Sequence, residues 1–583
     1  MENIEKIRHS LAHLLAAAVI EHYPSAKLTL GPAVDNGFYY DVDFGKIKSH
    51  DFNMDLAEFE KVMNSILPTW TEFSHREVSE KEAGKIFKGN EYKLELIKEI
   101  SERGEKITLY KAGDFEDLCR GGHVENPSKE IQPGSFKLER VAGAYWRGKE
   151  TNEMLTRIYG LAFATKKELD DYLAQQEEAK KRDHRILGQT LDLFTISEMV
   201  GKGLPLFTPN GMMLRELLNE YSQSLRAAKG WQKVWSPHIT KNDLYKTSGH
   251  WDKFGGELFL VKSQETKDEL VMKPMNCPHH QQIYASKPRS YKDLPIKYME
   301  TTTVYRDEKA GELLGLSRVR SITQDDSHTF CTPDQIQQIY QELIDATKVF
   351  YDKVGMPLRA RLSFRDPQSP KKYLGEISLW KKAEDILLDI AKKNNLDYFV
   401  AEGEAAFYGP KIDFMAKDSL GREWQLATPQ LDFVQPARFD LTYVDNEGKS
   451  QTPVMIHFAL MGSIERFLSV YIEHVAGNFP TWLAPVQMAI IPISAEKHLE
   501  YANELVKKFQ VSGFRFQVMA ENESLGKRIR EAEMQKIPYL LIIGDKEIAA
   551  NAVGVRQRGK GDLGQVAVDV FVEKIKTEIT NKS

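Results

Sequence analysis

The sequence of 583 residues is poor in cysteine and has no long apolar run. Its three cysteines, Cys119, Cys277 and Cys331, are too few for the disulfide framework of a small secreted protein. No segment approaches the roughly 18 consecutive apolar residues that a membrane-spanning helix needs. The start, MENIEKIRHS, mixes acidic and basic side chains and lacks the apolar core of a secretory signal. We therefore expect a cytoplasmic protein that does not span a membrane.

A strong charge of one sign is also missing, because 79 Lys and Arg residues face 84 Asp and Glu residues. A nucleic-acid partner would therefore have to be bound by a local basic surface. Apolar residues make up 42% and charged residues 28% of the chain, which excludes a disordered or low-complexity protein. The length corresponds to about three to five domains.

The patterns along the chain predict three blocks and one linker. Residues 1–165 open with a helical pattern and then alternate short strands with turns marked by glycine and proline. Residues 166–187 are charged on most faces and predict a single solvated helix between two domains. Residues 188–485 mix strands and helices without a regular βαβ rhythm, which predicts an α+β fold around an antiparallel sheet. Residues 486–583 predict a small α/β domain.

The central block contains three residues that are typical metal ligands. Cys277 lies in MKPMNCPHH, His328 in TQDDSHTF and His457 in VMIHFAL. Each of them, taken alone, is more often a buried core residue than a ligand. Their spacings are too long for a zinc finger, so the residues alone leave both interpretations open.

Arg306 follows the polar strand-like run METTTVY, and a loop with two glycines comes next before the strand pattern resumes at Val319. This pattern predicts a hairpin with an arginine at its mouth. The planar, permanently charged guanidinium there suits a phosphate group. A surface ion pair of Arg306 with Asp307 or Glu308 fits the same pattern.

The segment HFALMGSIERF predicts a strand that ends at Gly462 and a helix that begins near Ser463. Arg466 falls in the first turn of that helix. An ordinary solvated helix start, with Glu465 and Arg466 facing water, is equally compatible with the pattern.

Taken in order, three segments resemble the three motifs of class II aminoacyl-tRNA synthetases: GWQKVWSPHI after a helix, YRDE with SRVRSITQDD, and GSIERF. MKPMNCP, TQDDSHTF, AFYGPKIDF, QLATPQLDF and PVMIHFALMGSIERF narrow the resemblance to the threonyl-tRNA synthetase family. The resemblance extends from about Arg8 into the C-terminal domain. It implies ATP-dependent attachment of L-threonine to tRNA(Thr) through a threonyl-adenylate.

In this family, a cysteine and two histidines hold a catalytic zinc ion with one open position, and Cys277, His328 and His457 match them. A site that binds the substrate hydroxyl rejects valine, whereas an apolar pocket separates the two isosteres poorly. The resemblance also implies Mg²⁺ with ATP. It implies these further roles: Asp326 accepts from the threonine hydroxyl, Gln324 and Tyr408 line its pocket, Arg306 and Arg466 hold the ATP phosphates, Glu308 contacts adenine, and Lys411 and Gln425 surround the adenylate.

The N-terminal block contains a second cluster. HSLAH places His9 and His13 one helical turn apart, and LCRGGH places Cys119 and His123 around a Gly-Gly turn. The glutamate of a zincin motif is missing after His9, so that interpretation fails, but the residues alone leave a zinc site open.

GPAVDNGFYYD, EYKLELI, FEDLCRGGHV and AGAYWRG resemble the editing domain of bacterial threonyl-tRNA synthetases, which hydrolyses mischarged seryl-tRNA without a bound metal. Serine lacks only one methyl group, worth about 1–3 kcal/mol, so a second, hydrolytic selection step is needed. His9 and Lys93 are the candidates for water activation and tRNA contact. The resemblance implies a pocket lined by His9, His13, Lys93, Asp117, Cys119 and His123.

The sequence departs from the family pattern at three places. Gly122 stands where we expect proline, which predicts a looser turn. Phe458 stands where we expect arginine, which would affect contacts to tRNA or nucleotide. The resemblance starts almost on the first helix of the editing domain, so we expect the small domain that often precedes it to be missing.

The C-terminal block resembles the anticodon-binding domain of several class II synthetases. Asn522, Glu547 and Arg556 match positions that read anticodon bases, and Lys527, Arg528 and Arg530 would contact phosphates. Motif 1 forms the dimer interface in this class, which implies a homodimer around a helix over residues 213–229. Two other functions remain possible at this point: a synthetase-like protein that binds RNA without charging it, and a zinc hydrolase that uses the N-terminal cluster alone.

Overall fold

The computed structural model describes residues 3–45, 47 and 51–582. The chain forms two compact units, Met1–Glu178 and Ala179–Ser583, which are described separately. Within the described ranges, no helix combines the length and the apolar character needed to cross a membrane.

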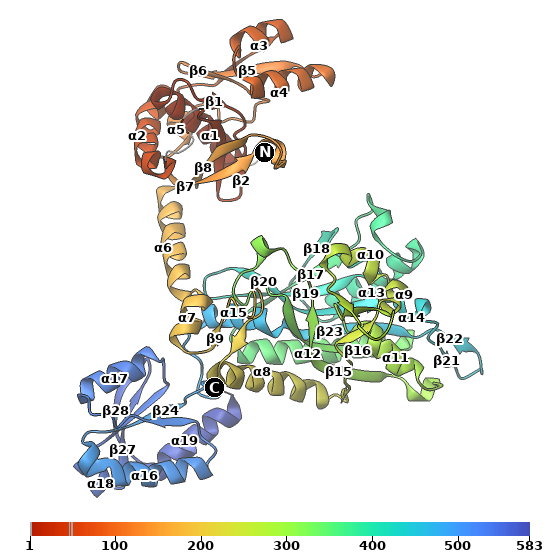
Figure 1. Cartoon of the computed structure of the whole chain (residues 1–583), viewed down its shortest axis with the longest axis vertical. Helices are drawn as coiled ribbons and strands as arrows, with labels where there is room; N and C mark the ends of the chain where they lie inside the picture. Colours follow the sequence, from red (N-terminus) through yellow and green to blue (C-terminus); the bar gives the residue numbers. More distant parts are fainter. Residues whose placement is uncertain (1–2, 46, 48–50, 583) are drawn as a thin grey trace. The chain divides into compact units, whose positions relative to one another are not determined.

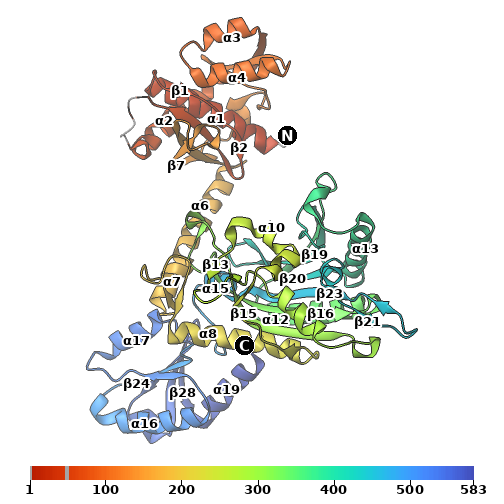
Figure 2. The same ribbon diagram turned by 45° about the vertical axis from the view of Figure 1, so that its right-hand side comes forward.

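The N-terminal unit is built around the apolar helix α1 (Asn3–His22; Figure 1). Leu11, Leu14 and Leu15 of this helix are fully buried. Helix α1 packs on a five-stranded antiparallel sheet in the order β1-β3-β8-β7, with β2 paired to β3. A three-stranded sheet, β4-β5-β6, lies beside α3 and α4 (Figure 1), and these two helices lie at one end of this unit (Figure 2). The bounds are β1 (Lys27–Leu28), β2 (Ala33–Val34), β3 (Gly37–Asp43), β4 (Ser74–Val78), α3 (Glu80–Ile86), α4 (Glu91–Glu102), β5 (Ile107–Ala112), β6 (Phe115–Leu118), β7 (Phe136–Tyr145) and β8 (Met154–Ala162).

The predicted linker helix over residues 166–187 is wrong in one respect, because it is two helices. Helix α6 (Lys166–Arg182) ends before Asp183, and α7 (His184–Thr190) begins after it. Asp183 leaves the helical conformation and its carboxylate accepts a hydrogen bond from the backbone N–H of Arg185 at 2.8 Å. Asp183 therefore caps a new helix rather than continuing the old one.

The large unit contains an eight-stranded sheet in the order β11-β15-β16-β23-β20-β19-β17-β18. All neighbouring pairs are antiparallel except β11 with β15 and β17 with β18, which confirms the predicted α+β fold. The bounds are β11 (Gln232–Lys233), β15 (Ile296–Tyr305), β16 (Ser321–Cys331), β17 (Leu358–Phe364), β18 (Tyr398–Glu402), β19 (Lys411–Lys417), β20 (Glu423–Asp432) and β23 (Val454–Ser463).

Three helices cover one face of this sheet and leave the other face for the site. They are α8 (Pro209–Ala227), α12 (Ile336–Lys353) and α15 (Ile464–His474), and they share one apolar core with the strands. Helix α8 begins earlier than predicted, because Thr208 caps it and Pro209 suits its first turn. Gln232 and Lys233, the strand after it, pair with β15.

The side chains of β23 alternate between these two faces, which decides the role of Phe458. His457 lies on the open face, whereas Phe458 is 2% exposed and belongs to the core under the helices. The expectation that Phe458 affects tRNA or nucleotide contacts is therefore wrong, since this residue is a core residue.

The C-terminal domain is the predicted α/β domain. Its sheet has the order β25-β24-β26-β27-β28, with a parallel part (β25, β24, β26) and an antiparallel part (β26, β27, β28). The strand β28 (Gly561–Ala567) is polar and exposed and was not expected from the sequence. The other bounds are β24 (Met488–Pro492), α16 (Ala495–Val511), β25 (Phe516–Val518), α17 (Leu525–Met534), β26 (Tyr539–Ile543), α18 (Asp545–Ala549), β27 (Ala552–Gln557) and α19 (Val568–Asn581).

Candidate functional site

Three segments that are far apart in the sequence bring Cys277, His328 and His457 together. Strands β16 and β23 are paired so that His328 and His457 are direct neighbours, and Cys277 begins helix α11 (Cys277–Ala285). All three side chains are buried, and one ligand atom of each lies within 4.8 Å of those of the others. The three candidate ligands therefore form one cluster.

Residues outside the cluster hold its two histidines in place through hydrogen bonds. Nδ1 of His328 lies 2.7 Å from Nδ1 of His280, and Nε2 of His280 lies 3.2 Å from a carboxylate oxygen of Glu300. Nε2 of His457 lies 2.9 Å from a carboxylate oxygen of Asp432. Nε2–H of His280 donates to Glu300, so Nδ1 of His280 accepts from Nδ1–H of His328, and Nε2–H of His457 donates to Asp432. The inner nitrogens of His328 and His457 are therefore left as acceptors.

These inner nitrogens, Nε2 of His328 and Nδ1 of His457, are 3.1 Å apart. Burial lowers the pKa of His328 well below its ordinary value, and burial raises the pKa of the Cys277 thiol. Two lone pairs that face each other, next to a buried sulfur, favour a bound cation. Two histidines and one cysteine suit Zn²⁺, and three protein ligands are typical of a catalytic site. The residues present therefore fit the metal that the family implies.

A cavity of about 670 Å³ lies on the open face of the sheet. It is lined by residues from the hairpin of β15 and β16 and from β19, β20 and β23. Six of the predicted residues line it: Arg306, Glu308, Gln324, Lys411, Gln425 and Arg466.

Arg306 lies at the mouth of the predicted hairpin, where β15 pairs with β16 along its whole length. Its guanidinium stacks over the ring of Phe254 at 4.7 Å, and its buried Nε has no hydrogen-bond partner among the described residues. Burial lowers the pKa of Arg306, because its guanidinium charge is poorly solvated. In the described part of the structure, Arg306 forms no ion pair with Asp307 or Glu308, because Asp307 pairs with Arg320 and Glu308 with Arg318. Arg306 therefore offers a charge and a free donor to an anion.

Ser463 caps α15 by accepting from the backbone N–H of Arg466 at 3.2 Å, as predicted. Glu465 is 2% exposed and accepts from the backbone N–H of Thr323 at 2.8 Å, so the solvated helix start is wrong for this residue. Among the described residues no carboxylate pairs with the guanidinium of Arg466, which lines the cavity. Both arginines thus face the same space with positive charge available.

Asp326 and Tyr408 lie against the cluster of candidate metal ligands rather than along the cavity wall. Oδ1 of Asp326 lies 3.8 Å from Nε2 of His328, and the other carboxylate oxygen, Oδ2, accepts from Nδ2 of Asn276 at 3.1 Å. The ring of Tyr408 is 4.9 Å from that of His457. The Tyr408 hydroxyl donates to Gln430, a cavity residue, at 3.1 Å, so cluster and cavity are neighbours.

Lys411 and Gln425 are oriented by a residue that sequence reasoning missed. The buried carboxylate of Asp413 accepts from Gln425 at 2.7 Å and pairs with Lys411 at 3.0 Å. His280, Glu300 and Asp432 were missed as well. Two features of the sequence could have indicated these residues. His280 follows closely after Cys277, and Glu300 and Asp432 are single charges inside strand-like runs, where a buried charge needs a partner.

In the N-terminal unit, a second cavity of about 470 Å³ contains five of the six predicted editing residues. Sγ of Cys119 lies 3.5 Å from Nε2 of His9 and 3.2 Å from Nε2 of His123. His123 does not line this cavity, which corrects the prediction, because its ring is stacked on Phe73 at 4.1 Å behind the cysteine. The lining residues of the predicted set are His9, His13, Lys93, Asp117 and Cys119.

The editing cluster differs electrostatically from the first cluster. Ligand atoms of the three histidines and Cys119 also lie within 4.8 Å of one another. However, Nδ1 of His9 and Nδ1 of His13 have no hydrogen-bond partner in the described part of the chain. Metal-ligating histidines usually have such outer support. Burial raises the pKa of Cys119 to about 11, so its thiol stays protonated at neutral pH.

At the floor of this cavity, Lys93 and Asp117 form a buried ion pair at 2.7 Å. The hydroxyl of Tyr40, which sequence reasoning missed, donates to Asp117 at 2.5 Å. Lys93 comes from α4, Asp117 from β6 and Tyr40 from β3. The ion pair therefore links α4 to the small three-stranded sheet, and the hydrogen bond from Tyr40 to Asp117 links that sheet to the main sheet of the unit.

The turn between Cys119 and His123 needs both of its glycines. Gly121 has φ = 90° and Gly122 has φ = 92°. Proline is fixed near φ = −65°, so this backbone is closed to the proline expected at position 122. The departure at Gly122 is thus a different turn, which still brings Cys119 and His123 together.

In the C-terminal domain, Glu547 of α18 and Arg556 of β27 lie on the same face of β27. Glu547 lies over Gly554, where an added Cβ would be 3.7 Å from its carboxylate, and Arg556 follows on the same face two residues later. Asn522 is exposed in the turn before α17. The prediction that Arg528 contacts phosphates is wrong, because it is 3% exposed and donates to the carbonyl oxygens of Pro492 and Met519.

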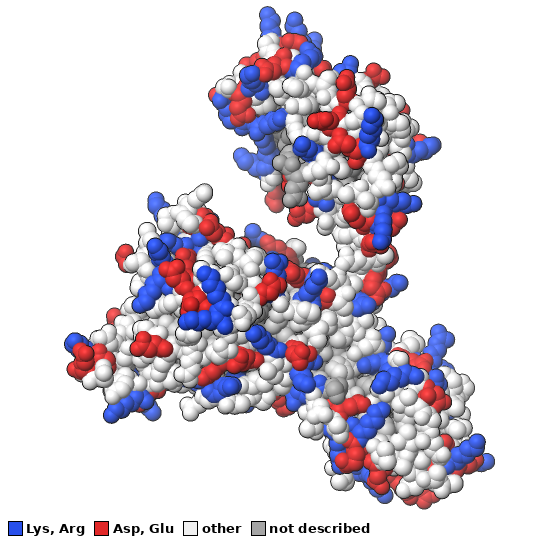
Figure 3. All heavy atoms as spheres, turned by 180° about the vertical axis from the view of Figure 1, so that it is seen from behind, with Lys and Arg blue, Asp and Glu red and all other residues white. Residues whose placement is uncertain are grey.

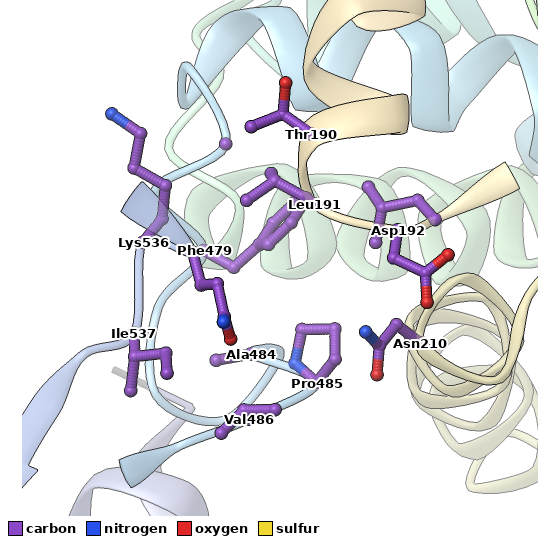
Figure 4. Close-up of a pocket in the computed structure, with 13 residues that line it drawn as sticks. Thr190, Leu191, Asp192, Asn210, Phe479, Ala484, Pro485, Val486, Lys536 and Ile537 are labelled. Atoms are coloured by element: carbon purple, nitrogen blue, oxygen red, sulfur yellow. The ribbon is translucent and has the colours of Figure 1, made fainter. Parts of the chain in front are cut away.

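A further cavity of about 290 Å³ lies between the strand region before α8 and the C-terminal domain. Its polar side chains include Asp192 and Asn210 on one side, whereas the amino group of Lys536 points away from it (Figure 4). None of the predicted site residues lines this cavity.

The hairpin of β15 and β16, the strand–helix pair β23–α15 and the helix–strand pair α8–β11 define a class II aminoacyl-tRNA synthetase. The family model of the tRNA synthetase class II core domain (G, H, P, S and T) matches residues 259–475. Models of the anticodon binding domain and of the threonyl and alanyl tRNA synthetase second additional domain match residues 487–578 and 107–159.

Among curated relatives, a threonine–tRNA ligase of Cytophaga hutchinsonii is 46% identical over 98% of this chain and 88% of its own length. One of Deinococcus radiodurans is 47% identical over 99% of this chain and 88% of its own length. The chain belongs to the threonine–tRNA ligase family.

Solved structures agree with this assignment. A structure described as the RNA binding domain of threonyl-tRNA synthetase from Cryptosporidium parvum has a TM-score of 0.64 and 35% identity, covering 68% of this chain and 98% of its own. A putative threonyl-tRNA synthetase from Aeropyrum pernix has a TM-score of 0.61 and 29% identity, covering 69% of this chain and 97% of its own.

Proposed function

We propose that the 670 Å³ cavity, together with the cluster of Cys277, His328 and His457, is the aminoacylation site of this threonine–tRNA ligase. The family activity is the ATP-dependent attachment of L-threonine to tRNA(Thr) through a threonyl-adenylate, with hydrolysis of mischarged seryl-tRNA. The observation that carries the proposal is the convergence of six polar and charged side chains on one cavity beside a buried cluster of metal ligands.

ATP occupies the cavity in this proposal. Arg306 and Arg466 hold its phosphates, since both guanidinium groups face the cavity and Nε of Arg306 is unpaired. Glu308 contacts the adenine, and Lys411 and Gln425, oriented by Asp413, surround the adenylate. Mg²⁺ accompanies ATP in class II synthetases. Catalysis then consists mainly of positioning the threonine carboxylate for attack on the α-phosphorus and of stabilising the developing charge.

Cys277, His328 and His457 would hold one Zn²⁺, and a bound zinc ion supplies an open coordination position for the amine and hydroxyl of threonine. Asp326, whose carboxylate is next to His328, accepts from the threonine hydroxyl. Tyr408 and Gln324 line the amino-acid pocket between cluster and cavity. This arrangement discriminates against valine, because valine has no hydroxyl to satisfy the buried polar groups.

The 470 Å³ cavity of the N-terminal unit is the editing site. His9 activates the hydrolytic water, and its buried, unpaired Nδ1 supports this role, because burial lowers the pKa of His9 and keeps the ring neutral. Lys93 contacts the terminal adenosine of tRNA from the cavity floor. His13, Asp117 and Cys119 shape the pocket, and His123 orients the Cys119 sulfur.

The C-terminal domain reads the anticodon through Asn522, Glu547 and Arg556. Lys527 and Arg530, both exposed on α17, contact phosphates. On the face in Figure 3, basic and acidic side chains are interspersed. On this face, tRNA would therefore contact local basic groups rather than one wide basic surface.

The proposal includes a homodimer formed through motif 1. Helix α8 and the segments after it expose large apolar side chains, including Met212 (40%), Trp235 (71%) and Ile239 (46%). Their burial against a second copy would stabilise the dimer. We place this dimer in the cytoplasm, where the three free cysteines stay reduced.

The same proposal assigns one role to each of four segments of the chain. Residues 1–165 edit, residues 166–187 link, residues 188–485 catalyse aminoacylation and residues 486–583 bind the anticodon. The family models of the core, the anticodon domain and the second additional domain fall inside these ranges.

The test is ATP–pyrophosphate exchange with threonine, serine and valine, before and after zinc removal. We expect strong exchange with threonine, some with serine, almost none with valine, and loss on chelation. Exchange with no amino acid would favour a protein that binds RNA without charging it. Threonine exchange that survives chelation would contradict the roles of Cys277, His328 and His457. Hydrolysis of seryl-tRNA without any ATP-dependent activity would favour the hydrolase.

A further inference from the structure

The first residue of α7, His184, is a buried histidine that none of the roles above uses. It is 2% exposed. Its Nδ1 lies 2.7 Å from a carboxylate oxygen of Glu473, and its backbone N–H donates to the same oxygen at 3.1 Å. Glu473, near the end of α15, also accepts from Arg422 at 2.6 Å. Helix α15, which begins within the GSIERF motif, therefore fixes His184 from one side.

On its other side, His184 contacts the loop between β15 and β16. The backbone N–H of Leu316 donates to Nε2 of His184 at 3.1 Å. The loop approaches closely because Gly315 has no side chain, and an added Cβ there would be 2.3 Å from this nitrogen. Since Nε2 accepts, Nδ1 carries the proton and donates to Glu473, so the two contacts require one neutral tautomer.

Leu316, the residue bound to His184, is followed directly by residues that line the 670 Å³ cavity. Ser317 and Arg318, which follow Leu316, both line that cavity. Ser317 donates to Ser469 of α15 at 3.0 Å, and Nε of Arg318 donates to Glu308 at 2.8 Å. A shift of the loop at Leu316 would therefore move the partners of Glu308.

We infer that His184 is a positioning residue that seats the β15–β16 loop and thereby sets the ATP-binding geometry of Glu308 and Arg318. The inference rests on the proposal that the cavity binds ATP. His184 does not reach the cavity itself, so it acts only through the loop. In the proposed function threonine is held at the cluster of Cys277, His328 and His457, which comes from α11, β16 and β23, so the amino-acid pocket does not depend on this anchor.

Two conservative variants separate the contacts of His184. In His184→Asn, the amide N–H replaces Nδ1 and keeps the bond to Glu473, but the acceptor for Leu316 is lost. In His184→Gln, the amide oxygen replaces Nε2 and keeps the bond from Leu316, but the donor to Glu473 is lost. Both are measured in the full-length protein by ATP–pyrophosphate exchange, with KM for ATP, KM for threonine and the melting temperature.

We expect His184→Asn to raise KM for ATP about tenfold, as the loss of one buried hydrogen bond would, with KM for threonine unchanged. His184→Gln should restore KM for ATP to near the wild-type value even if it melts at a lower temperature. An unchanged KM for ATP in His184→Asn overturns the inference. So does a larger rise in His184→Gln than in His184→Asn, or an equal rise in both KM values that follows the loss of stability.

Arg306→Ala and Arg466→Ala distinguish this inference from the assignment of the cavity. If these variants retain the wild-type KM for ATP, the cavity is not the ATP site and the proposed function fails. If they raise KM for ATP while His184→Asn does not, only the anchoring role of His184 fails.

Discussion

His328 and His457 are direct cross-strand neighbours of β16 and β23, and their facing ring nitrogens are 3.1 Å apart. A shift of the strand register by one residue would turn one of the two rings to the opposite face. The candidate metal site thus depends on the pairing of two distant strands, because His328 and His457 are 129 residues apart in the sequence.

The contact of His280 with His328 predicts that His280 strengthens metal binding. His280→Ala removes the contact to His328 and should weaken zinc affinity by about 10- to 100-fold, as loss of an outer hydrogen bond to a ligand typically does. His279→Ala is the matched control, because neither ring nitrogen of His279 has a hydrogen-bond partner in the described structure. Competition with a chromogenic chelator measures both affinities. Equal affinities of the two variants would contradict the support role of His280.

The ion pair of Lys93 and Asp117 predicts a large difference between two lysines of helix α4. Lys93→Ala leaves a buried carboxylate without its cation, which should destabilise the N-terminal unit by about 3–5 kcal/mol. Lys98→Ala removes an exposed pair with Glu102 and should change stability by less than about 0.5 kcal/mol. Hydrogen exchange of α4 amides measures both changes. Similar protection of the two variants would show that the buried pair contributes little.

The editing histidines predict acid sensitivity of the N-terminal unit. Burial lowers the pKa of His13, and burial lowers that of His123 to about 2. Between the lowered folded pKa and the unfolded value near 6.5, the unfolded state binds more protons, so the free energy of unfolding falls as the pH drops below about 6.5. Each histidine contributes at most about 1.4 kcal/mol per pH unit.

Protection factors of α1 amides, corrected for intrinsic exchange rates, measure this dependence between pH 7.5 and pH 5. His123→Gln should reduce the slope, because one of the buried neutral groups no longer titrates. A protection factor that is constant over this range, or a slope unchanged in His123→Gln, would be incompatible with the lowered pKa values.

The sequence predicted the sheet, the hairpin around Arg306 and the helix start at Ser463, since these follow from local patterns. The three candidate metal ligands were identified from the family resemblance, because their spacing alone left a core role open. The outer residues His280 and Glu300 were not predictable, since their contacts depend on the register of distant strands. For the same reason, no local pattern indicated that Arg528 is buried.

The proposed editing role of His9 predicts a separation of two activities. His9→Ala should leave threonine charging intact, since the editing site is in another compact unit, while seryl-tRNA accumulates. His22→Ala, at the exposed end of the same helix, is the control and should behave like the wild type. Charging assays with radioactive serine and with threonine measure both. Wild-type levels of seryl-tRNA in His9→Ala would refute editing by this residue.

The anticodon proposal is tested at Arg556, whose side chain is 40% exposed on β27 and lies 3.9 Å from a carboxylate oxygen of Glu533. A guanidinium that reads a base edge contributes about 1–3 kcal/mol, so Arg556→Ala should raise KM for tRNA about 10- to 100-fold. ATP–pyrophosphate exchange should not change, because this step needs no tRNA. Lys560→Ala, in the exposed turn after β27, removes an equal charge without a base contact and should change KM for tRNA only slightly. Two variants with the same small effect would mean that Arg556 contributes charge alone and that the anticodon is read elsewhere.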